Sequence, residues 1–187
     1  MAQARDNIVT KGFSGTIDRT LTFRQRAGRT IVSKLRRPSS VAPTEKMQTV
    51  RAKFTTSIAF AKKAIKDLVL KALYGSAATG MQSAYNIATA DAFNPPVVNS
   101  INKDSYHGAI GDAITIDATD DFKVESVSVS IHDAAGNLVE QGKAFLQVDR
   151  PDWLYTTTAA NPALAGSKIT ATATDLPGNS ASLEITL

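Results

Sequence analysis

The 187-residue sequence has no cysteine, only two histidines and one tryptophan, and few aromatic residues of any kind. Without cysteine the chain can form no disulfide, no thiolate metal site and no thiol nucleophile. The Walker, GxSxG, HExxH and GxGxxG patterns are also missing. Histidine is the most frequent general base, and the spacing of His107 and His132 does not match a metal site. The sequence therefore predicts a protein that is not an enzyme.

Long apolar runs are lacking as well. The stretch from Ile58 to Ile65 is interrupted by Lys62 and Lys63, and it is far shorter than the roughly 20 residues that span a bilayer as a helix. The first seven residues lack the apolar segment that defines a secretory signal peptide. We therefore expect no membrane span and a protein assembled in the bacterial cytoplasm.

A Pro95-Pro96 pair separates two parts of opposite charge. Residues 1–94 contain 16 Lys+Arg and 5 Asp+Glu, a net charge of +11, whereas residues 95–187 contain 5 Lys+Arg and 12 Asp+Glu, a net charge of -7. Opposed charges of this size attract within a Debye length of roughly 8 Å at physiological salt. The sequence predicts two domains, a basic assembly region over 1–94 and an acidic domain over 95–187.

The basic part is expected to contain a β-hairpin followed by two or three helices. The hairpin is predicted over residues 13–35, with its turn at Arg26-Ala27-Gly28, because glycine supplies the positive φ of a tight turn. Apolar residues then recur every three or four positions from Met47 to Ile65, which indicates one long helix. Shorter helices are expected near residues 67–74 and 83–93. So small a core predicts a region that depends on neighbouring subunits for stability.

The acidic part changes to a period of two, which is typical of β-strands with one buried face. Seven strands are predicted, over residues 97–101, 113–118, 124–132, 138–148, 153–158, 168–174 and 181–187. Seven short alternating strands in about 90 residues are the pattern of an immunoglobulin-like β-sandwich, with Trp153 as its core aromatic residue. The expected fold class is thus α+β in two parts, with the sandwich at the C-terminus.

Cations crowd into the predicted hairpin and the segment after it. They suit either the phosphates of a nucleic acid or an acidic protein surface. Only one aromatic residue lies among them, which argues against base stacking and favours the protein partner. The candidate partner-binding residues are Arg19, Phe23, Arg24, Arg26, Arg29, Ile31, Val32, Lys34, Arg36 and Arg37.

Four aspartates of the acidic part form the candidate metal site: Asp117, Asp120, Asp121 and Asp175. In a sandwich the loops after the second and sixth predicted strands can lie at the same end, where several carboxylates could bind Ca²⁺. The alternative is that these aspartates cap turns and stay solvated. No other cofactor is expected.

Several short motifs resemble a group of uncharacterised small proteins of Bacteroidota and their prophages. The motifs are Gly15-Thr16-Ile17, Thr22-Phe23-Arg24-Gln25, Gly28-Arg29-Thr30-Ile31-Val32-Ser33, Ser83-Ala84-Tyr85-Asn86, Asp120-Asp121-Phe122 and Ala173-Thr174-Asp175-Leu176-Pro177-Gly178-Asn179. The resemblance implies a basic N-terminal hairpin and helical region followed by a bacterial immunoglobulin-like domain. It implies no catalytic activity.

These observations lead to the hypothesis of a structural component of a bacteriophage virion or phage-like particle, such as a capsid-associated or decoration protein. The N-terminal half would dock onto neighbouring subunits by strand addition, as a homo-oligomer or bound to the particle, with the immunoglobulin-like domain displayed outward. Two alternatives stay open. One is a nucleic-acid-binding protein that uses the basic half, and the other is a subunit of an extracellular filament or surface assembly.

Overall fold

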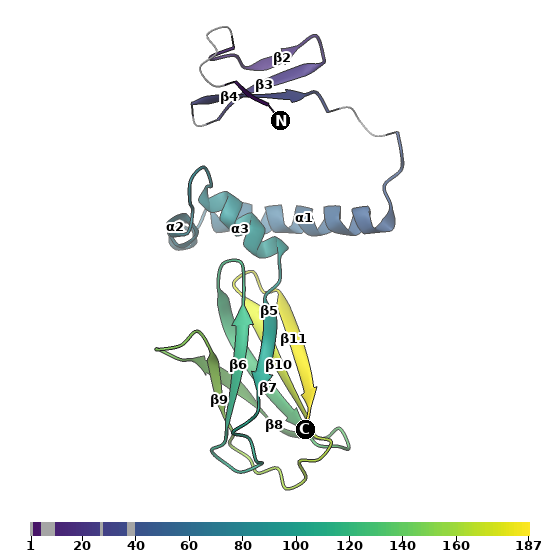
Figure 1. The fold of residues 1–187 in the computed structure, drawn as a ribbon, viewed down its shortest axis with the longest axis vertical. Coiled ribbons are helices and arrows are strands. Elements are labelled where there is room, and N and C mark those ends of the chain that lie inside the picture. Colours follow the sequence, from purple (N-terminus) through teal and green to yellow (C-terminus); the bar gives the residue numbers. More distant parts are fainter. Residues whose placement is uncertain (1, 5–9, 27, 37–39) are drawn as a thin grey trace. The chain divides into compact units, whose positions relative to one another are not determined.

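The computed structural model describes residues 2–4, 10–26, 28–36 and 40–187. The chain is of the α+β class, as predicted, and it divides into two compact units, Met1–Gln48 and Thr49–Leu187. A small sheet lies in the first unit, and three helices followed by seven strands make up most of the second (Figure 1). Among the described residues, no helix combines the length and apolar character needed to cross a membrane.

The first unit is built on a small antiparallel sheet with the strand order β1-β4-β3-β2. The strands are β1 (Ala2–Ala4), β2 (Gly15–Ile17), β3 (Leu21–Arg26) and β4 (Arg29–Lys34). The predicted hairpin is confirmed as β3 and β4, which pair Arg26 with Arg29 at the turn. Gly28 has a φ of 72°, the left-handed conformation that its lack of a Cβ makes accessible. Ala27 of the predicted turn lies outside the described residues.

A second tight turn, absent from the sequence-based prediction, separates β2 from β3. Its two central residues, Asp18 and Arg19, have φ values of 51° and 48°, and the Thr20 backbone N–H donates to the Ile17 carbonyl at 3.1 Å. Positive φ at both central positions defines a type I′ turn, which matches the twist of hairpin strands. Aspartate tolerates this conformation but arginine seldom adopts it. The sequence therefore contains no sign of a turn here, and the predicted hairpin had its turn only at residues 26–28.

Three helices follow in the described part of the chain: α1 (Glu45–Ala64), α2 (Leu68–Ser76) and α3 (Ala84–Phe93). The Asp67 carboxylate caps α2 by accepting from the backbone N–H groups of Val69 at 2.8 Å and Leu70 at 3.1 Å. Ser83 caps α3 in the same way, accepting from the Asn86 N–H at 3.4 Å. Side-chain oxygens at these positions satisfy N–H groups that a helix leaves unpaired. The helices confirm the expected number.

The buried face of α1 differs from the predicted apolar stripe. Its buried residues are Ser57, Ala61 and Ala64, all small, and the two alanines pack in one cluster with the fully buried Tyr74 of α2. At the start of the helix, Met47, Val50 and Phe54 are 47%, 54% and 49% exposed. Helical periodicity thus located the helix correctly but did not show how much of its apolar stripe is covered.

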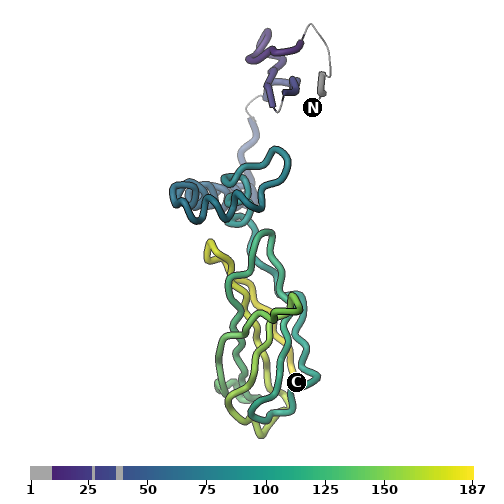
Figure 2. The backbone as a smooth tube through the Cα atoms, turned by 90° about the vertical axis from the view of Figure 1, so that its left-hand side faces the viewer, coloured from purple at the N-terminus to yellow at the C-terminus, as the bar shows by residue number. Residues whose placement is uncertain are grey.

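The seven predicted strands are confirmed as one antiparallel sheet with the order β11-β10-β7-β8-β9-β6-β5. They are β5 (Val97–Asn102), β6 (Ala113–Thr119), β7 (Val124–His132), β8 (Leu138–Leu146), β9 (Trp153–Thr156), β10 (Lys168–Asp175) and β11 (Ser180–Thr186). One end of β8 pairs with β7 and its other end with β9, so the sheet curls around a common interior (Figure 2). Its outer strands β11 and β5 come into contact, which gives a sandwich close to a barrel.

Alternate residues of the strands fill this interior. Ile114, Ile116, Val127 and Val129 are fully buried, and Trp153 is 8% exposed, which confirms the predicted core aromatic residue. Burying an aliphatic side chain of this size contributes about 1.5–3 kcal/mol. The sandwich therefore holds the larger of the two apolar cores in unit Thr49–Leu187.

The second core joins the helices to the sandwich. Phe122, from the β6–β7 connection, packs against Tyr74 with ring centroids 4.6 Å apart and ring planes at 37°, and Leu176, which follows β10, packs in the same cluster. The predicted boundary at Asn94-Pro95 therefore falls inside the second unit. Charge and periodicity do change there, because α3 ends and β5 begins, but apolar residues from both sides of that point pack together.

This shared core predicts how fragments of the chain behave. The fragment Thr49–Leu187 should unfold at a higher temperature than Pro95–Leu187, because removal of the helices uncovers Phe122 and Leu176. Thermal unfolding followed by circular dichroism measures the difference. Equal unfolding temperatures would show that the helices contribute nothing to the stability of the sandwich.

Candidate functional site

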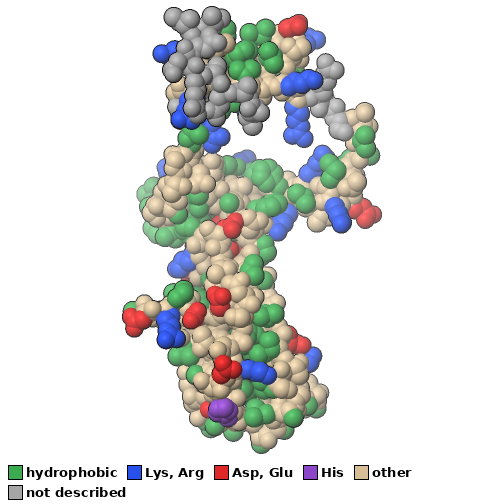
Figure 3. All heavy atoms as spheres, viewed as in Figure 1, with side chains coloured by type: hydrophobic (Ala, Val, Ile, Leu, Met, Phe, Trp, Pro, Cys, Tyr) green, Lys and Arg blue, Asp and Glu red, His purple; other side chains and the backbone are tan. Residues whose placement is uncertain are grey.

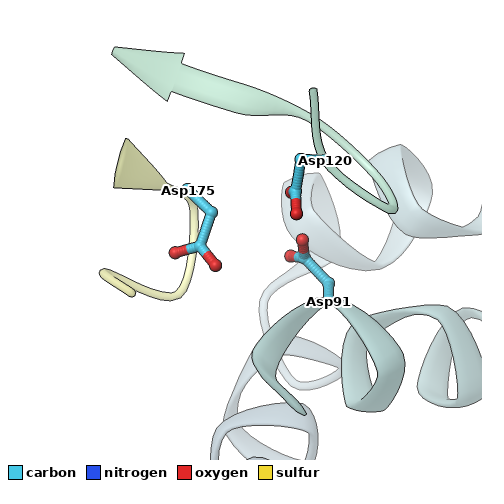
Figure 4. A group of neighbouring side chains, drawn as sticks. All are labelled: Asp91, Asp120 and Asp175. Atoms are coloured by element: carbon cyan, nitrogen blue, oxygen red, sulfur yellow. The ribbon is translucent and has the colours of Figure 1, made fainter. Parts of the chain in front are cut away.

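Three aspartates meet where the helices contact the sandwich. Asp91 comes from α3, Asp120 from the β6–β7 connection and Asp175 from the end of β10. One carboxylate oxygen of each lies within 4.8 Å of the others. The carboxylates of Asp91 and Asp120 point toward each other, and that of Asp175 lies beside them (Figure 4). We call these three residues the aspartate cluster.

The aspartate cluster is largely shielded from solvent. Asp91 is 0% exposed and Asp175 is 2% exposed, while Asp120 is half-buried. While both carboxylates are charged, two of the buried oxygens, Asp91 Oδ1 and Asp120 Oδ1, receive no hydrogen bond from a donor among the described residues. A buried polar atom without a partner costs about 1–3 kcal/mol, and more if it is charged. The cluster is therefore incomplete as a set of hydrogen bonds.

The other oxygen of Asp91 is held by α2. The hydroxyl of Tyr74 donates to Asp91 Oδ2 at 2.5 Å, and both side chains are fully buried. Burial raises the pKa of Tyr74, and the hydrogen bond to Asp91 and the neighbouring carboxylates raise it further. The tyrosine consequently stays protonated and acts as a permanent donor that fixes the orientation of the Asp91 carboxylate.

Asp175 is positioned by the turn that joins β10 to β11. Its Oδ1 accepts from the backbone N–H of Asn179 at 2.6 Å and its Oδ2 from the Asn179 side-chain amide at 2.7 Å. The same amide donates to the Ala92 carbonyl at 3.4 Å, which ties the turn to α3. This arrangement is the turn-capping role expected of an aspartate, so both oxygens of Asp175 already accept one hydrogen bond.

The structure brings together two of the four aspartates that the sequence suggested. Asp120 and Asp175 meet, since their loops lie at the same end of the sandwich. Asp117 lies on β6 opposite Ser100, outside the aspartate cluster. The exposed Asp121 accepts at Oδ2 from the Asn94 side-chain amide at 2.6 Å, so it links the end of α3 to the β6–β7 connection.

Asp91 was missed because it lies in the basic half of the chain. It is the one charged residue of α3, and a single charge in an otherwise neutral helix is the sequence signal that could have pointed to it. A buried charge needs a partner. The linear pattern did not reveal that this partner comes from loops of the sandwich.

No cation of the described residues neutralises the aspartate cluster. The ion pairs in the described part of the chain join Lys123 to Glu125 and Lys168 to Glu184. Burial raises the pKa of Asp91 to about 7, with Asp120 and Asp175 adding to the effect and the Tyr74 hydrogen bond opposing it. Burial also raises the pKa of Asp175. The cluster favours either a bound proton or a bound cation.

The predicted partner-binding residues lie on the small N-terminal sheet or just after it. Arg19, Arg24, Arg26, Arg29, Lys34 and Arg36 are exposed, and Arg37 lies outside the described residues. Phe23 is buried and packs edge-on against Phe13, with centroids 5.8 Å apart. It is therefore part of the core of this sheet and does not offer a surface for a partner.

Strand register places three of these cations, Arg24, Arg26 and Arg29, on one face of the sheet, and Lys34 on the other. Arg24 lies opposite Ile31, and Arg26 lies opposite Arg29, whereas the alternate pair, Phe23 with Val32, faces the other way. We call the surface formed by Arg24, Arg26, Arg29 and Ile31 the arginine face. Lys and Arg side chains are visible over the N-terminal sheet in Figure 3, while Asp and Glu side chains are scattered over the sandwich.

Comparison of the chain with protein-family models, with curated protein sequences and with solved structures found no match. No family is therefore assigned to the chain, and the immunoglobulin-like identity of the sandwich stays a prediction. The aspartate cluster and the arginine face are the two features whose chemistry bears on function.

The Tyr74–Asp91 hydrogen bond predicts the effect of removing one hydroxyl. Tyr74→Phe should lower the free energy of unfolding by about 1–3 kcal/mol, because it leaves a second oxygen of the buried Asp91 without a donor. Tyr85→Phe, at a half-buried tyrosine of α3 outside the cluster, is the matched control and should change stability less. Urea denaturation measures the free energy of unfolding of both variants. An equal decrease in the two would contradict a specific stabilising role of the Tyr74 hydroxyl.

The raised pKa of Asp91 predicts a dependence of stability on pH. The folded protein holds a proton on Asp91 that the unfolded chain releases above about pH 4, so the free energy of unfolding should fall as pH rises from about 4 to 7. Asp91→Asn should reduce this fall. Urea denaturation across that range, in buffer with a chelator, compares the two proteins, and identical pH profiles would contradict the assignment.

Proposed function

We propose that the protein is a non-enzymatic structural component of a bacteriophage virion or phage-like particle. In this role the N-terminal unit, Met1–Gln48, docks onto an acidic surface of a neighbouring subunit, and the sandwich is displayed outward as an immunoglobulin-like domain. The observation that carries the proposal is the arginine face, on which two arginines oppose each other across exposed strands.

The Arg26–Arg29 pair costs stability in the isolated sheet. Like charges directly opposite each other on neighbouring strands repel, and neither ion pair formed by the described residues includes Arg26 or Arg29. Arginine binds carboxylates and phosphates through paired N–H groups. A partner that supplies anions would therefore turn an unfavourable pair into a favourable contact.

The thin core of the N-terminal sheet supports a role that depends on partners. Among the described side chains of Met1–Gln48, only Phe23 and Thr30 are buried. Phe13, Ile17 and Leu21 are 45%, 51% and 42% exposed. Units this small need additional stabilisation from disulfides, metals or assembly, and the chain has no cysteine. Burial of these side chains against another subunit would supply it.

The partner to which we commit is the acidic part of a second copy of the chain. Residues 95–187 carry a net charge of -7, opposite in sign to the arginine face. Contact between unlike parts of successive copies is heterologous, so it can close into rings or extend into larger assemblies. This is the kind of contact on which particle components rely.

Strand order supports the immunoglobulin-like part of the proposal. Strands β5, β6 and β9 pair as one group and β7, β8, β10 and β11 as another, with β8 passing between the groups. Two antiparallel layers of three and four strands around a buried tryptophan are typical of such domains. The exposed hairpin of β8 and β9 carries Phe145 and Val148, which are 76% and 100% exposed, and offers an apolar surface for a further contact.

Charge reversal of the arginine pair tests the proposal. Wild-type protein should self-associate in low-salt buffer and dissociate as salt increases, and Arg26→Glu with Arg29→Glu should weaken association at least tenfold. The control, Lys62→Glu with Lys63→Glu on the exposed surface of α1, makes the same change in net charge and should leave association intact. Sedimentation velocity measures both, with negative-stain imaging of the assemblies.

A wild-type protein that stays monomeric at high concentration in low salt would contradict the proposal. Filter binding with duplex and single-stranded DNA at two salt concentrations tests the alternative partner, a nucleic acid. Binding that is lost in the Arg26 and Arg29 variant, without self-association of the wild type, would assign the arginine face to nucleic acid instead.

A further inference from the structure

We infer that the aspartate cluster is a calcium site that joins α3 to two loops of the sandwich. The inference is independent of the arginine face and of the proposed assembly. It rests on the distances between three carboxylates, on two buried oxygens that lack partners, and on the charge around them.

The distances suit the coordination sphere of Ca²⁺. Oxygen ligands lie 2.3–2.6 Å from Ca²⁺, so two ligands on opposite sides of the ion are separated by roughly 4.6–5.2 Å. One oxygen each of Asp91, Asp120 and Asp175 already lies within 4.8 Å of the other two. Mg²⁺ demands near-ideal octahedral geometry and gives up its bound water reluctantly, whereas Ca²⁺ accepts flexible arrangements of carboxylates and water, so we take Ca²⁺ as the ion.

The oxygens without partners point to a missing ligand. Asp91 is fully buried, yet its Oδ1 has no donor among the described residues, and Asp120 Oδ1 is in the same state. The two carboxylates are aimed at each other (Figure 4). When both are charged, they repel each other. A cation between them would satisfy both oxygens at once.

Hydrogen bonds from neighbouring residues orient two of the three carboxylates. Side chains that bind a metal ion are commonly held in place in this way. The Tyr74 hydroxyl donates to Asp91 Oδ2 at 2.5 Å and leaves Asp91 Oδ1 available to an ion. Asn179 donates to both oxygens of Asp175, at 2.6 and 2.7 Å. A carboxylate oxygen has two lone pairs, so each can accept one such hydrogen bond and still bind a metal ion.

Asp120 is the member of the aspartate cluster that lies nearest to solvent. This half-buried residue also lines a surface hollow, together with Thr119, Phe122 and Lys123. Ca²⁺ takes six to eight oxygen ligands, and the inference requires water molecules or further protein oxygens to complete the set that the three aspartates begin.

A proton shared between Asp91 and Asp120 is the rival occupant, because it too would satisfy the two orphan oxygens. The two occupants differ in one measurable respect, since only the metal site makes stability depend on the calcium concentration. A ligand that binds only the folded state raises the unfolding temperature in proportion to the logarithm of its concentration above the dissociation constant.

Calorimetric titration of the chelator-treated full chain with CaCl₂ tests the inference, with MgCl₂ as the comparison metal. We expect one Ca²⁺ per chain, a weaker response to Mg²⁺, and an unfolding temperature that rises with calcium. Asp91→Asn should weaken binding at least tenfold. Asp104→Asn, at an exposed aspartate outside the cluster, should bind as the wild type does.

Asp120→Asn provides a second variant if Asp91→Asn does not fold, because Asp120 lies nearer the surface. Tb³⁺ emission excited through tyrosine offers an independent signal, since Tyr74 contacts the site. No heat and no thermal shift at millimolar calcium would overturn the inference in favour of the shared proton. Calcium binding that is unchanged in both Asp91→Asn and Asp120→Asn would also overturn it.

Discussion

The burial of Asp91 is the constraint on which the second unit depends. This carboxylate is fully enclosed where α3 meets the sandwich. Tyr74 of α2 donates to it, and the carboxylates of Asp120, after β6, and Asp175, at the end of β10, lie beside it. A buried charge is tolerated only when its surroundings hold it in place. Hydrogen bonds from Asn94 to Asp121 and from Asn179 to the Ala92 carbonyl join the helices to the sandwich beside this carboxylate, together with the ring contact of Tyr74 and Phe122.

This junction changes how the two oppositely charged halves are understood. Net charge divides the chain at Pro95, but packing divides it at Gln48. The three helices belong with the sandwich even though they carry positive charge. What remains is a small basic sheet with two buried side chains among its described residues, attached to a unit with two cores. Such an asymmetry suits a protein that combines a docking element with a self-sufficient body.

Much of the fold could be predicted from periodicity, because each element shows its own local pattern. The alternation at Val127, Val129 and Ile131 defined β7, and Gly28 marked the β3–β4 turn. The type I′ turn at Asp18 and Arg19 escaped, since its conformation is unusual for arginine. The site was only half predictable. Asp120 and Asp175 follow from strand order, but Asp91 depends on how α3 packs, and a linear pattern carries no information about that contact.

The central claim is that a docking sheet, stabilised by its partners, is joined to a stable helix–sandwich unit. Hydrogen–deuterium exchange of the full chain tests it most directly, in dilute solution at moderate salt and in concentrated solution at low salt. The account predicts that α2 and α3 exchange as slowly as the sandwich strands in both states. It also predicts that β3 and β4 exchange rapidly when dilute and become protected when concentrated. Slow exchange of β3 and β4 in the dilute protein, or exchange of the helices at rates unrelated to the sandwich, would contradict it.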